Sequence, residues 1–425
     1  MTAQQLLLPD WVKNIYLVPE KSKGSYFFDK NSDRSILDFF SFFSTLPLGY
    51  NHPIYSSSEF LNDLAVYGGF KFSTGRIRTE FYDRFVEEFH NFVNQKIFCK
   101  YFFIHGGGLA VENALKIAFD WKRYVNEQSG IKVEGNDLKI IALEEGFHGV
   151  TGYGLSLSSN ELKGSHFPKF DWPKFKAPYM RFPYNENDKE GFIIEQRHAL
   201  SSIEKYIEQR GKQYIAAIII ELIQGGGGDR HLGKYFVQGL KDICDKYNIL
   251  LIFDEVQTGF GSTGKLWCYE HYGVTPHILT FGKKAQISGV CIGRHIPEIE
   301  NVTNVPGRLS PTWNGDITDY IRCKYIMKAF KDDYLIENAA ELGQYIISEL
   351  NKMNKFSNVR GRGFLIALDF ESTKMRDKYD DLCFQEGLFL LAMKDKTLRM
   401  RPNMALTKKE ADHALDIMHK VNRIL

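Results

Sequence analysis

The stretch Ile249-Leu-Leu-Ile-Phe-Asp254-Glu-Val-Gln257-Thr-Gly259 decides the fold class of this 425-residue chain. It begins with a short apolar run, of the kind found in strands that are buried on both faces of a parallel sheet. An acid, Asp254, follows the run at once. Ligands of open α/β sheets bind at the carboxyl ends of the strands, so Asp254 is a candidate site residue. The same pattern also fits an acid that caps a loop.

Other apolar runs repeat this pattern through the middle of the chain. They are short, and they lie at Phe98–Ile104, Lys139–Leu143, Tyr214–Ile220 and His277–Phe281. Between such runs, the stretches Leu109–Arg123 and Gln238–Tyr247 carry apolar residues at helical spacing. Strands that alternate with helices predict an α/β domain around a central, mostly parallel sheet.

The last hundred or so residues follow a different pattern. Long helical patterns at Asp319–Phe330 and Glu337–Met353 precede two strand-like stretches, Phe364–Phe370 and Gly387–Ala392. This order indicates a smaller α+β domain. We therefore predict a large domain over residues 51–305 and a small C-terminal domain over residues 306–425. The N-terminal segment, residues 1–50, is expected to pack with the small domain.

The composition excludes several classes of protein. With 54 Lys plus Arg and 52 Asp plus Glu, the formal net charge is +2, which argues against a nucleic-acid footprint over the whole chain. No apolar stretch approaches the roughly 20 residues of a membrane helix, and the first residues do not form a signal peptide. The six cysteines form no CxxC pair, so we expect no metal site. We predict a cytoplasmic protein without a membrane or nucleic-acid partner.

Two further motifs follow strand-like runs. In Thr280-Phe-Gly-Lys283-Lys284, a lysine that forms a Schiff base would need a lowered pKa, and a second lysine beside it would help. A solvated basic loop is the alternative. In His105-Gly-Gly-Gly108, bare backbone amides at a helix start can cradle a phosphate, although glycines also serve tight turns. The motif fits neither the dinucleotide fingerprint nor the P-loop, so a single small phosphate suits it better.

The third motif is Glu144-Glu-Gly-Phe147-His148-Gly149. An aromatic ring at a strand end can stack on a planar cofactor, but Phe147 could equally pack in the core. An acid such as Asp254 can keep a pyridinium nitrogen protonated, and the ring then acts as an electron sink.

The chain resembles the class III (omega) aminotransferases of pyridoxal-phosphate (PLP) fold type I, and among them L-lysine 6-aminotransferases. The resemblance covers most of the chain. Its motifs are SFFSTLPLGYNHP at 41–53, GGGLAVENALKIAFDWK at 106–122, FPKFDWPK at 167–174, IQGGGGDRH at 223–231, DEVQTGFGSTG at 254–264, FGKKAQISGV at 281–290, RLSPTWNGDITD at 308–319, RGRG at 360–363 and RMRP at 399–402.

This resemblance implies a role for each matching residue. Lys283 would carry PLP as a Schiff base, Asp254 would pair with the ring nitrogen, and Gln257 would lie near the ring hydroxyl. The other cofactor contacts that it implies are Gly107 and Gly108 at the phosphate, Thr312 from the partner subunit, Phe147 on the ring with His148 beside it, and the active-site acid Glu221. Arg399 would bind a substrate carboxylate. A shared site implies a homodimer.

Two departures from the family pattern concern the substrate. The family's FHGR ends in Val150 here, which removes an arginine that binds a substrate carboxylate. The family's QGE ends in Gly226, which removes a glutamate that masks the class III arginine. Arg76 and Arg78 add two cations that could compensate, or they could be a solvated surface pair. We expect poorer use of free L-lysine and 2-oxoglutarate than in a typical lysine 6-aminotransferase.

The leading hypothesis is therefore an aminotransferase that moves a terminal primary amino group to a 2-oxo acid such as 2-oxoglutarate. A second hypothesis keeps PLP but changes the outcome to racemisation or decarboxylation, or the substrate to a modified or carrier-bound amino acid. A third is a non-catalytic binding protein on this fold.

Overall fold

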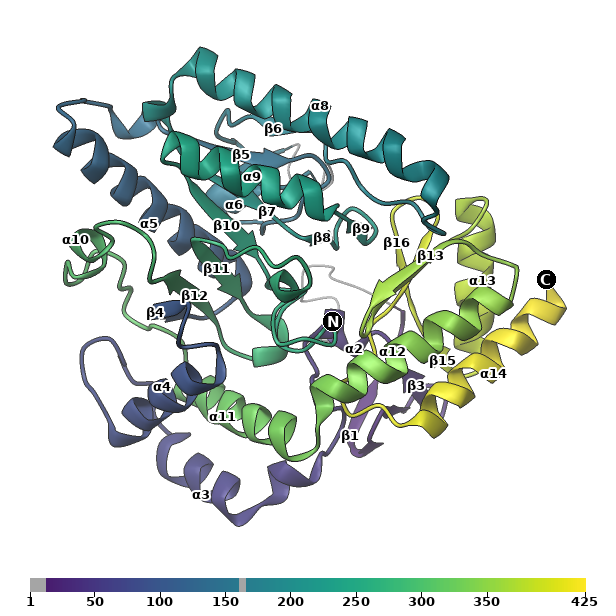
Figure 1. The fold of residues 1–425 in the computed structure, drawn as a ribbon. Coiled ribbons are helices and arrows are strands. Elements are labelled where there is room, and N and C mark those ends of the chain that lie inside the picture. The colour runs from purple at the N-terminus through teal and green to yellow at the C-terminus, as the bar shows by residue number, and fades with distance from the viewer. Residues whose placement is uncertain (1–12, 160–165) are drawn as a thin grey trace.

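A seven-stranded sheet forms the centre of the molecule (Figure 1). The computed structural model describes residues 13–159 and 166–425. In spatial order the strands are β4 (Phe98–Ile104), β12 (Ser288–Gly293), β11 (Ile278–Phe281), β10 (Leu250–Asp254), β7 (Ile215–Ile220), β5 (Lys139–Leu143) and β6 (Lys174–Phe175). Strand β12 runs antiparallel to both of its neighbours, and the other pairings are parallel. The predicted mostly parallel sheet is confirmed.

Both faces of this sheet are buried. Successive side chains of a strand point to opposite faces, and Leu250 and Ile252 belong to one hydrophobic cluster whereas Leu251 and Phe253 belong to another. Helix α5 (Gly107–Gln128) covers the first face. Helices α9 (Lys234–Tyr247) and α8 (Glu186–Arg210) cover the other (Figure 1). This double cover explains why the strands are apolar along their whole length.

Three helices lie beside the large sheet at its β4 end. Helix α11 (Ile317–Asp332) packs against α3 (Ser58–Tyr67) and α4 (Glu80–Phe92). Shorter elements of this part are α2 (Ser41–Ser44), α6 (Gly152–Leu157), α10 (Glu300–Thr303), the hairpin of β8 (Ile223–Gln224) with β9 (Arg230–His231), and the single turns η1 (Pro53–Ser56), η2 (Gly135–Asp137), η3 (Lys212–Tyr214), η4 (Cys268–His271) and η5 (Lys283–Ala285).

A second, smaller sheet is formed by the C-terminal part of the chain. Its strands, in spatial order, are β13 (Ser357–Arg362), β14 (Leu365–Asp369), β17 (Thr397–Met400) and β16 (Leu391–Met393). All its pairings are antiparallel. The helices of this part are α12 (Leu335–Lys352), α13 (Thr373–Gln385) and α14 (Lys408–Ile424). Helix α12 packs on β13, and α14 packs on α12 and α13.

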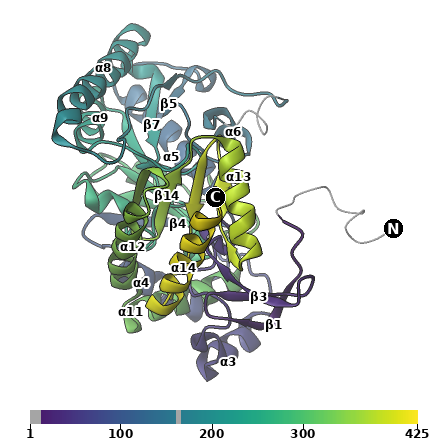
Figure 2. The same cartoon turned by 90° about the vertical axis from the view of Figure 1, so that its right-hand side faces the viewer.

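The two ends of the chain meet in a third sheet. Strands β1 (Leu17–Lys23), β2 (Tyr26–Asp29) and β3 (Arg34–Asp38) form a meander, and β15 (Leu388–Phe389) pairs in parallel with β3. Figure 2 shows β1 and β3 beside the C-terminal helices. The pairing agrees with an N-terminal segment that packs with the small domain, but the boundaries at residues 51 and 305 stay a prediction.

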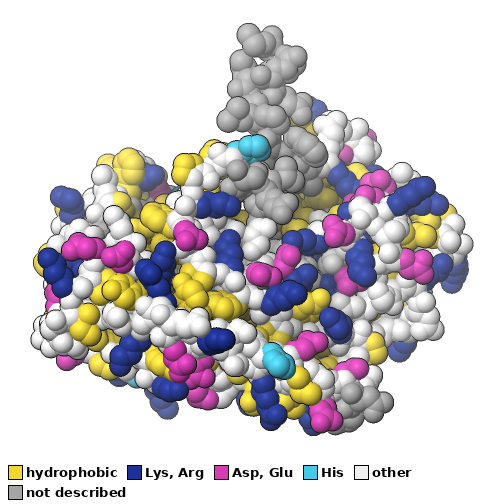
Figure 3. All heavy atoms as spheres, turned by 90° about the horizontal axis from the view of Figure 1, so that it is seen from above, with side chains coloured by type: hydrophobic (Ala, Val, Ile, Leu, Met, Phe, Trp, Pro, Cys, Tyr) yellow, Lys and Arg dark blue, Asp and Glu magenta, His cyan; other side chains and the backbone are white. Residues whose placement is uncertain are grey.

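The described residues include no helix that is both long and apolar enough to cross a membrane. On the face seen in Figure 3, basic and acidic side chains are interspersed. The near balance of charge over the sequence is therefore also a local property of that face.

Candidate functional site

Four predicted site motifs and Glu221 come together at one edge of the large sheet. Strands β4, β5, β7, β10 and β11 all run in the same direction, so their carboxyl ends meet at that edge. The residues that follow these strands are, in the same order, the glycines from Gly106, Phe147 with His148, Glu221, Asp254 itself, and Lys283. Spacing in the sequence could suggest each motif, and the parallel sheet brings them to one place.

Asp254 is held from two sides. His148 Nδ1 lies 2.8 Å from Asp254 Oδ2, and Thr280 Oγ1 donates to Asp254 Oδ1 at 2.9 Å. Only 4% of Asp254 and 2% of His148 is exposed. These contacts fix the orientation of the Asp254 carboxylate. Such fixing is needed for a group that must face one atom of a bound ring.

Glu221 connects two loops of the site. Its carboxylate accepts the amide of Phe147 at 2.8 Å and the amide of Gly225 at 3.1 Å. Burial raises the pKa of Glu221 to about 7, His148 lowers it and Asp254 raises it further. Because Glu221 contacts the backbones on both sides, it positions the Phe147 loop against the glycine run Gly225–Gly228.

The two lysines of the Gly-Lys-Lys motif have different surroundings. Lys283 is half-buried and opens the turn η5 with a φ of 46°, whereas Lys284 is 2% exposed. The pKa of Lys283 is lowered to about 7, first by burial and then by the cations Arg399 and Arg401. The pKa of Lys284 is also lowered to about 7, by burial, Arg401 and Lys283. Either amine can therefore be neutral near pH 7, which a nucleophilic lysine requires.

The glycines at the start of helix α5 leave its amides open. Gly106 is the N-cap, with a φ of 97° and no side-chain cap. A Cβ on Gly107 would lie 2.6 Å from Val256 Cγ1, so a larger residue cannot take this position without a shift. The Gly108 position faces Thr151 Oγ1 and Gly149 Cα, at 3.7 and 3.8 Å from the place of a Cβ. Free amides at a helix N-terminus favour an anion such as a phosphate.

The glycine run Gly225–Gly228 forms a wall of the site. A Cβ on Gly225 would lie 2.1 Å from Gln257 Oε1, and one on Gly226 would lie 2.8 Å from Phe147 Cβ. The oxygen Oε1 of Gln257 is buried and has no hydrogen-bond partner among the described residues. Because an unsatisfied buried acceptor is costly, it indicates a donor that the chain itself does not supply.

Arg399 has polar neighbours although Gly226 replaces the glutamate that masks this arginine in the family. Its Nη1 donates to the carbonyl of Gly225 at 2.8 Å and lies 3.6 Å from Asp229 Oδ1. The pKa of Arg399 is lowered to about 10, first by burial and then by Arg401. Asp229 therefore provides an anionic neighbour although Gly226 carries no side chain. The Nε of Arg399 remains without a partner in the described chain.

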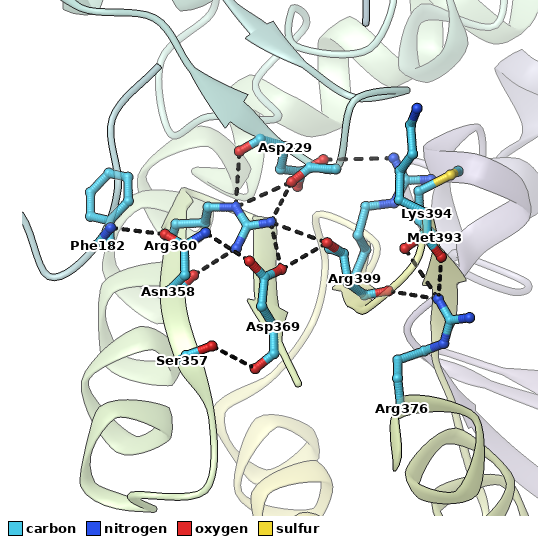
Figure 4. A network of polar contacts seen from close by, with 12 residues as sticks. Phe182, Asp229, Ser357, Asn358, Arg360, Asp369, Arg376, Met393, Lys394 and Arg399 are labelled. Atoms are coloured by element: carbon cyan, nitrogen blue, oxygen red, sulfur yellow. Dashed lines mark hydrogen bonds and ion pairs between the residues drawn. The ribbon is translucent and has the colours of Figure 1, made fainter. Parts of the chain in front are cut away.

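Sequence reasoning missed the network around Arg399. Arg401 Nη2 lies 2.5 and 2.6 Å from the two oxygens of Asp229. Arg360 donates to the carbonyls of Gly228 and Asp229, and Figure 4 shows Arg360 beside Asp229. Burial opposes ionisation of Asp229, but Arg401 and Arg399 outweigh it and hold the pKa of Asp229 below its usual value. The two RxR patterns, at 360–362 and 399–401, mark the arginines of this network, but nothing in them indicates Asp229 as their partner.

The remaining predicted residues lie outside this cluster within one chain. Arg76, Arg78 and Thr312 are exposed, and Arg78 Nε bonds Asp83 Oδ1 at 3.0 Å. Their loops lie against each other, since Lys71 Nζ is 4.3 Å from the centroid of the Trp313 ring. Among the described residues, no contact joins these three to Lys283 or Asp254 within one chain.

The comparisons with known proteins agree with this geometry. The class III aminotransferase family model matches residues 7–421. The chain therefore belongs to the class III aminotransferases, and it is a PLP-dependent aminotransferase of fold type I. The L-lysine-epsilon aminotransferase of Mycobacterium tuberculosis is 37% identical over 410 residues, which cover 95% of this chain and 90% of that protein.

One relative of similar identity is named for a different amino donor. A probable mitochondrial 4-aminobutyrate aminotransferase of Caenorhabditis elegans is 32% identical over 94% of this chain and 86% of its own length. Among solved structures, the lysine aminotransferase of M. tuberculosis superposes with a TM-score of 0.93 at 35% identity, over 99% of this chain and 98% of that one. The chain is thus of the lysine 6-aminotransferase type.

Proposed function

We propose that the enzyme transfers the terminal amino group of lysine, or of a related ω-amino compound, to a 2-oxo acid such as 2-oxoglutarate. The substrates of the similar lysine aminotransferases support this choice. One observation carries the chemistry. Lys283, whose pKa is lowered to about 7, lies at the same edge of the sheet as Asp254, which His148 and Thr280 hold in place.

The residues present fit pyridoxal phosphate. Gly107 and Gly108 would bind the phosphate at the open start of α5, Asp254 would face the ring nitrogen, and the unpartnered Gln257 Oε1 would accept from the ring hydroxyl. Phe147 would cover the ring, with His148 orienting Asp254 behind it. Lys283 would hold the cofactor through Nζ. When bound, the cofactor supplies a ring that accepts electrons from the substrate carbon.

The chain's own residues then have separate tasks. Once the substrate amine has displaced it from the cofactor, Lys283 Nζ would take a proton from the substrate carbon and return it, since a pKa of about 7 suits both steps near neutral pH. Asp254 would keep the ring nitrogen of the bound cofactor charged. Glu221 holds the Phe147 loop against the glycine run, and Arg399 would bind a carboxylate of the 2-oxo acid.

We further propose that the enzyme works as a homodimer in the cytoplasm. Phe70, Ile77 and Trp313 are 63%, 66% and 48% exposed, and they lie on the two adjoining loops that carry Arg76, Arg78 and Thr312. Exposed apolar groups of this kind mark interaction surfaces. A second copy there would bring Thr312 to the neighbouring phosphate site and the two arginines toward its substrate. The unpaired cysteines fit a reducing compartment.

A steady-state screen of amines with 2-oxoglutarate tests the proposal. Glutamate should form with L-lysine or a close ω-amino relative as the donor. Racemisation or loss of carbon dioxide without transfer to the 2-oxo acid would refute it.

A further inference from the structure

An ion pair joins the small sheet to the Phe147 loop. Lys394 lies in the turn between β16 and β17, and its Nζ contacts Oε2 of Glu145, which lies two residues before Phe147. The side chains are 38% and 32% exposed, so the pair lies at the surface rather than in the core. A half-exposed pair of this kind can exchange partners at little cost, because water screens it.

The glycine run shows where this pair lies relative to the site. The Gly225 position faces Gln257 and Arg399, the Gly226 position faces Phe147, and a Cβ on Gly227 would lie 3.2 Å from Glu145 Cβ. Two residues of chain span at most about 7 Å. Glu145 and Lys394 therefore lie at the outer end of the wall whose inner end faces Gln257 and Arg399.

Both members of the pair are held by their backbones. Arg376, on α13, donates through Nη1 to the carbonyls of Met393 and Lys394 at 3.2 and 2.8 Å (Figure 4). The amide of Glu145 donates to Ser159 Oγ at 3.0 Å. The φ angles of Glu145 and Lys394 are 65° and 53°, which non-glycine residues rarely adopt. Strained residues of this kind are concentrated at functional sites.

We infer that Lys394 and Glu145 together bind the zwitterionic far end of an ω-amino substrate. Lys394 takes its α-carboxylate and Glu145 takes its α-ammonium while the terminal amine points inward. This assignment rests on the proposed function. The chain of lysine between its two amino-bearing carbons spans roughly 5 Å, given carbon–carbon bonds of about 1.5 Å, which falls within the roughly 7 Å that two residues of chain can span. Lys394 then supplies the cation that Val150 does not.

Three amino donors distinguish the role of Lys394 from that of Glu145. They are L-lysine, cadaverine, which lacks the carboxylate, and ε-aminocaproate, which lacks the α-amino group. KM and kcat are measured for each with the holoenzyme at saturating 2-oxoglutarate. Lys394→Met should raise the KM for lysine and ε-aminocaproate about three- to tenfold and leave cadaverine unchanged. Glu145→Gln should raise the KM for lysine and cadaverine and leave ε-aminocaproate unchanged.

Two further variants complete the experiment. Lys394→Arg should retain most of the affinity for lysine, and Lys396→Met, an exposed lysine in the same turn, should change none of the three KM values. If both pair variants alter all three donors alike, or lower kcat with KM unchanged, the pair is only a bridge between domains and the inference is wrong. If the unaltered enzyme transfers nitrogen from none of the donors, the proposed function fails, and the inference fails with it.

Discussion

Lys283 depends for its reactivity on residues that are far from it in the sequence. The Gly-Lys-Lys motif shows where the amine lies, and the strand before it shows that it lies at a sheet edge. Burial lowers its pKa most, and the cations that lower it further are Arg399 on β17 and Arg401 directly after that strand. No pattern around residue 283 could predict their effect, because it arises only when the two sheets pack together.

This lowered pKa predicts how the apoenzyme captures PLP. The amine of Lys283 is charged below a pKa of about 7 and neutral above it, so the rate of capture should rise between pH 6 and 8 and then level off. Stopped-flow absorbance of apoenzyme mixed with PLP measures this rate. A midpoint near the 10.5 of an ordinary lysine would contradict the assigned environment.

Asp254→Asn should bind the cofactor but lose activity by about a hundredfold or more, the cost of removing a placed electrostatic group from an active site. An amide cannot keep the ring nitrogen protonated, although it can still accept from Thr280. Visible absorbance of the purified variant and its kcat decide the matter. Asp242→Asn, at an acid on the exposed side of α9, serves as the control. Normal turnover in Asp254→Asn would exclude the role.

At the scale of elements, the sequence predicted the longer parallel strands but missed the short parallel strand β6 and the antiparallel strand β12. Strands β4 and β5 have the predicted bounds, and β7, β10 and β11 each begin one residue later. Strand β12, Ser288–Gly293, went unnoticed because its sequence SGVCIG is short and contains two glycines. The predicted strand at Gly387–Ala392 divides at Leu390 into β15 and β16, which join different sheets.

The buried pair Arg401–Asp229 should be the ion pair on which the packing of the β8–β9 hairpin against the small sheet depends most. Both side chains are fully buried. Arg401→Met would leave Asp229 with only the 3.6 Å contact to Arg399, and breaking a buried pair costs about 3–5 kcal/mol. The expected result is a lower urea midpoint. Lys408→Met, which removes an exposed pair with Asp412 on α14, should shift it little. Equal shifts in the two variants would contradict this ranking.

At the scale of the whole molecule, the site combines parts that are remote in the sequence. The sheet edge supplies the cofactor residues, the glycine run forms a wall, and β17 supplies Arg399. The motifs could predict the first of these. They could not predict that Asp229 would face Arg399, or that Arg78 would pair with Asp83, because those contacts depend on tertiary packing.

The exposed loops predict a dimer that a single charge should weaken. Trp313 is 48% exposed on the loop beside Thr312, so Trp313→Asp would place a carboxylate in the proposed interface. Light scattering after size exclusion should give twice the 49.1 kDa chain mass for the unaltered protein and a shift toward the monomer in the variant. The matched control is Tyr334→Asp, because Tyr334 is 70% exposed and lies outside the two loops of the proposed interface. A monomeric, fully active enzyme would contradict the shared site.

The most direct test of the account follows the amino nitrogen itself. L-lysine with a heavy-nitrogen label at the ε position is mixed with the PLP-loaded enzyme and 2-oxoglutarate, and the glutamate formed is analysed by mass spectrometry. We predict labelled glutamate with the unaltered enzyme and with Lys284→Ala at a reduced rate, and none with Lys283→Ala. Transfer that survives Lys283→Ala, or unlabelled glutamate as the only product, would contradict the central claim.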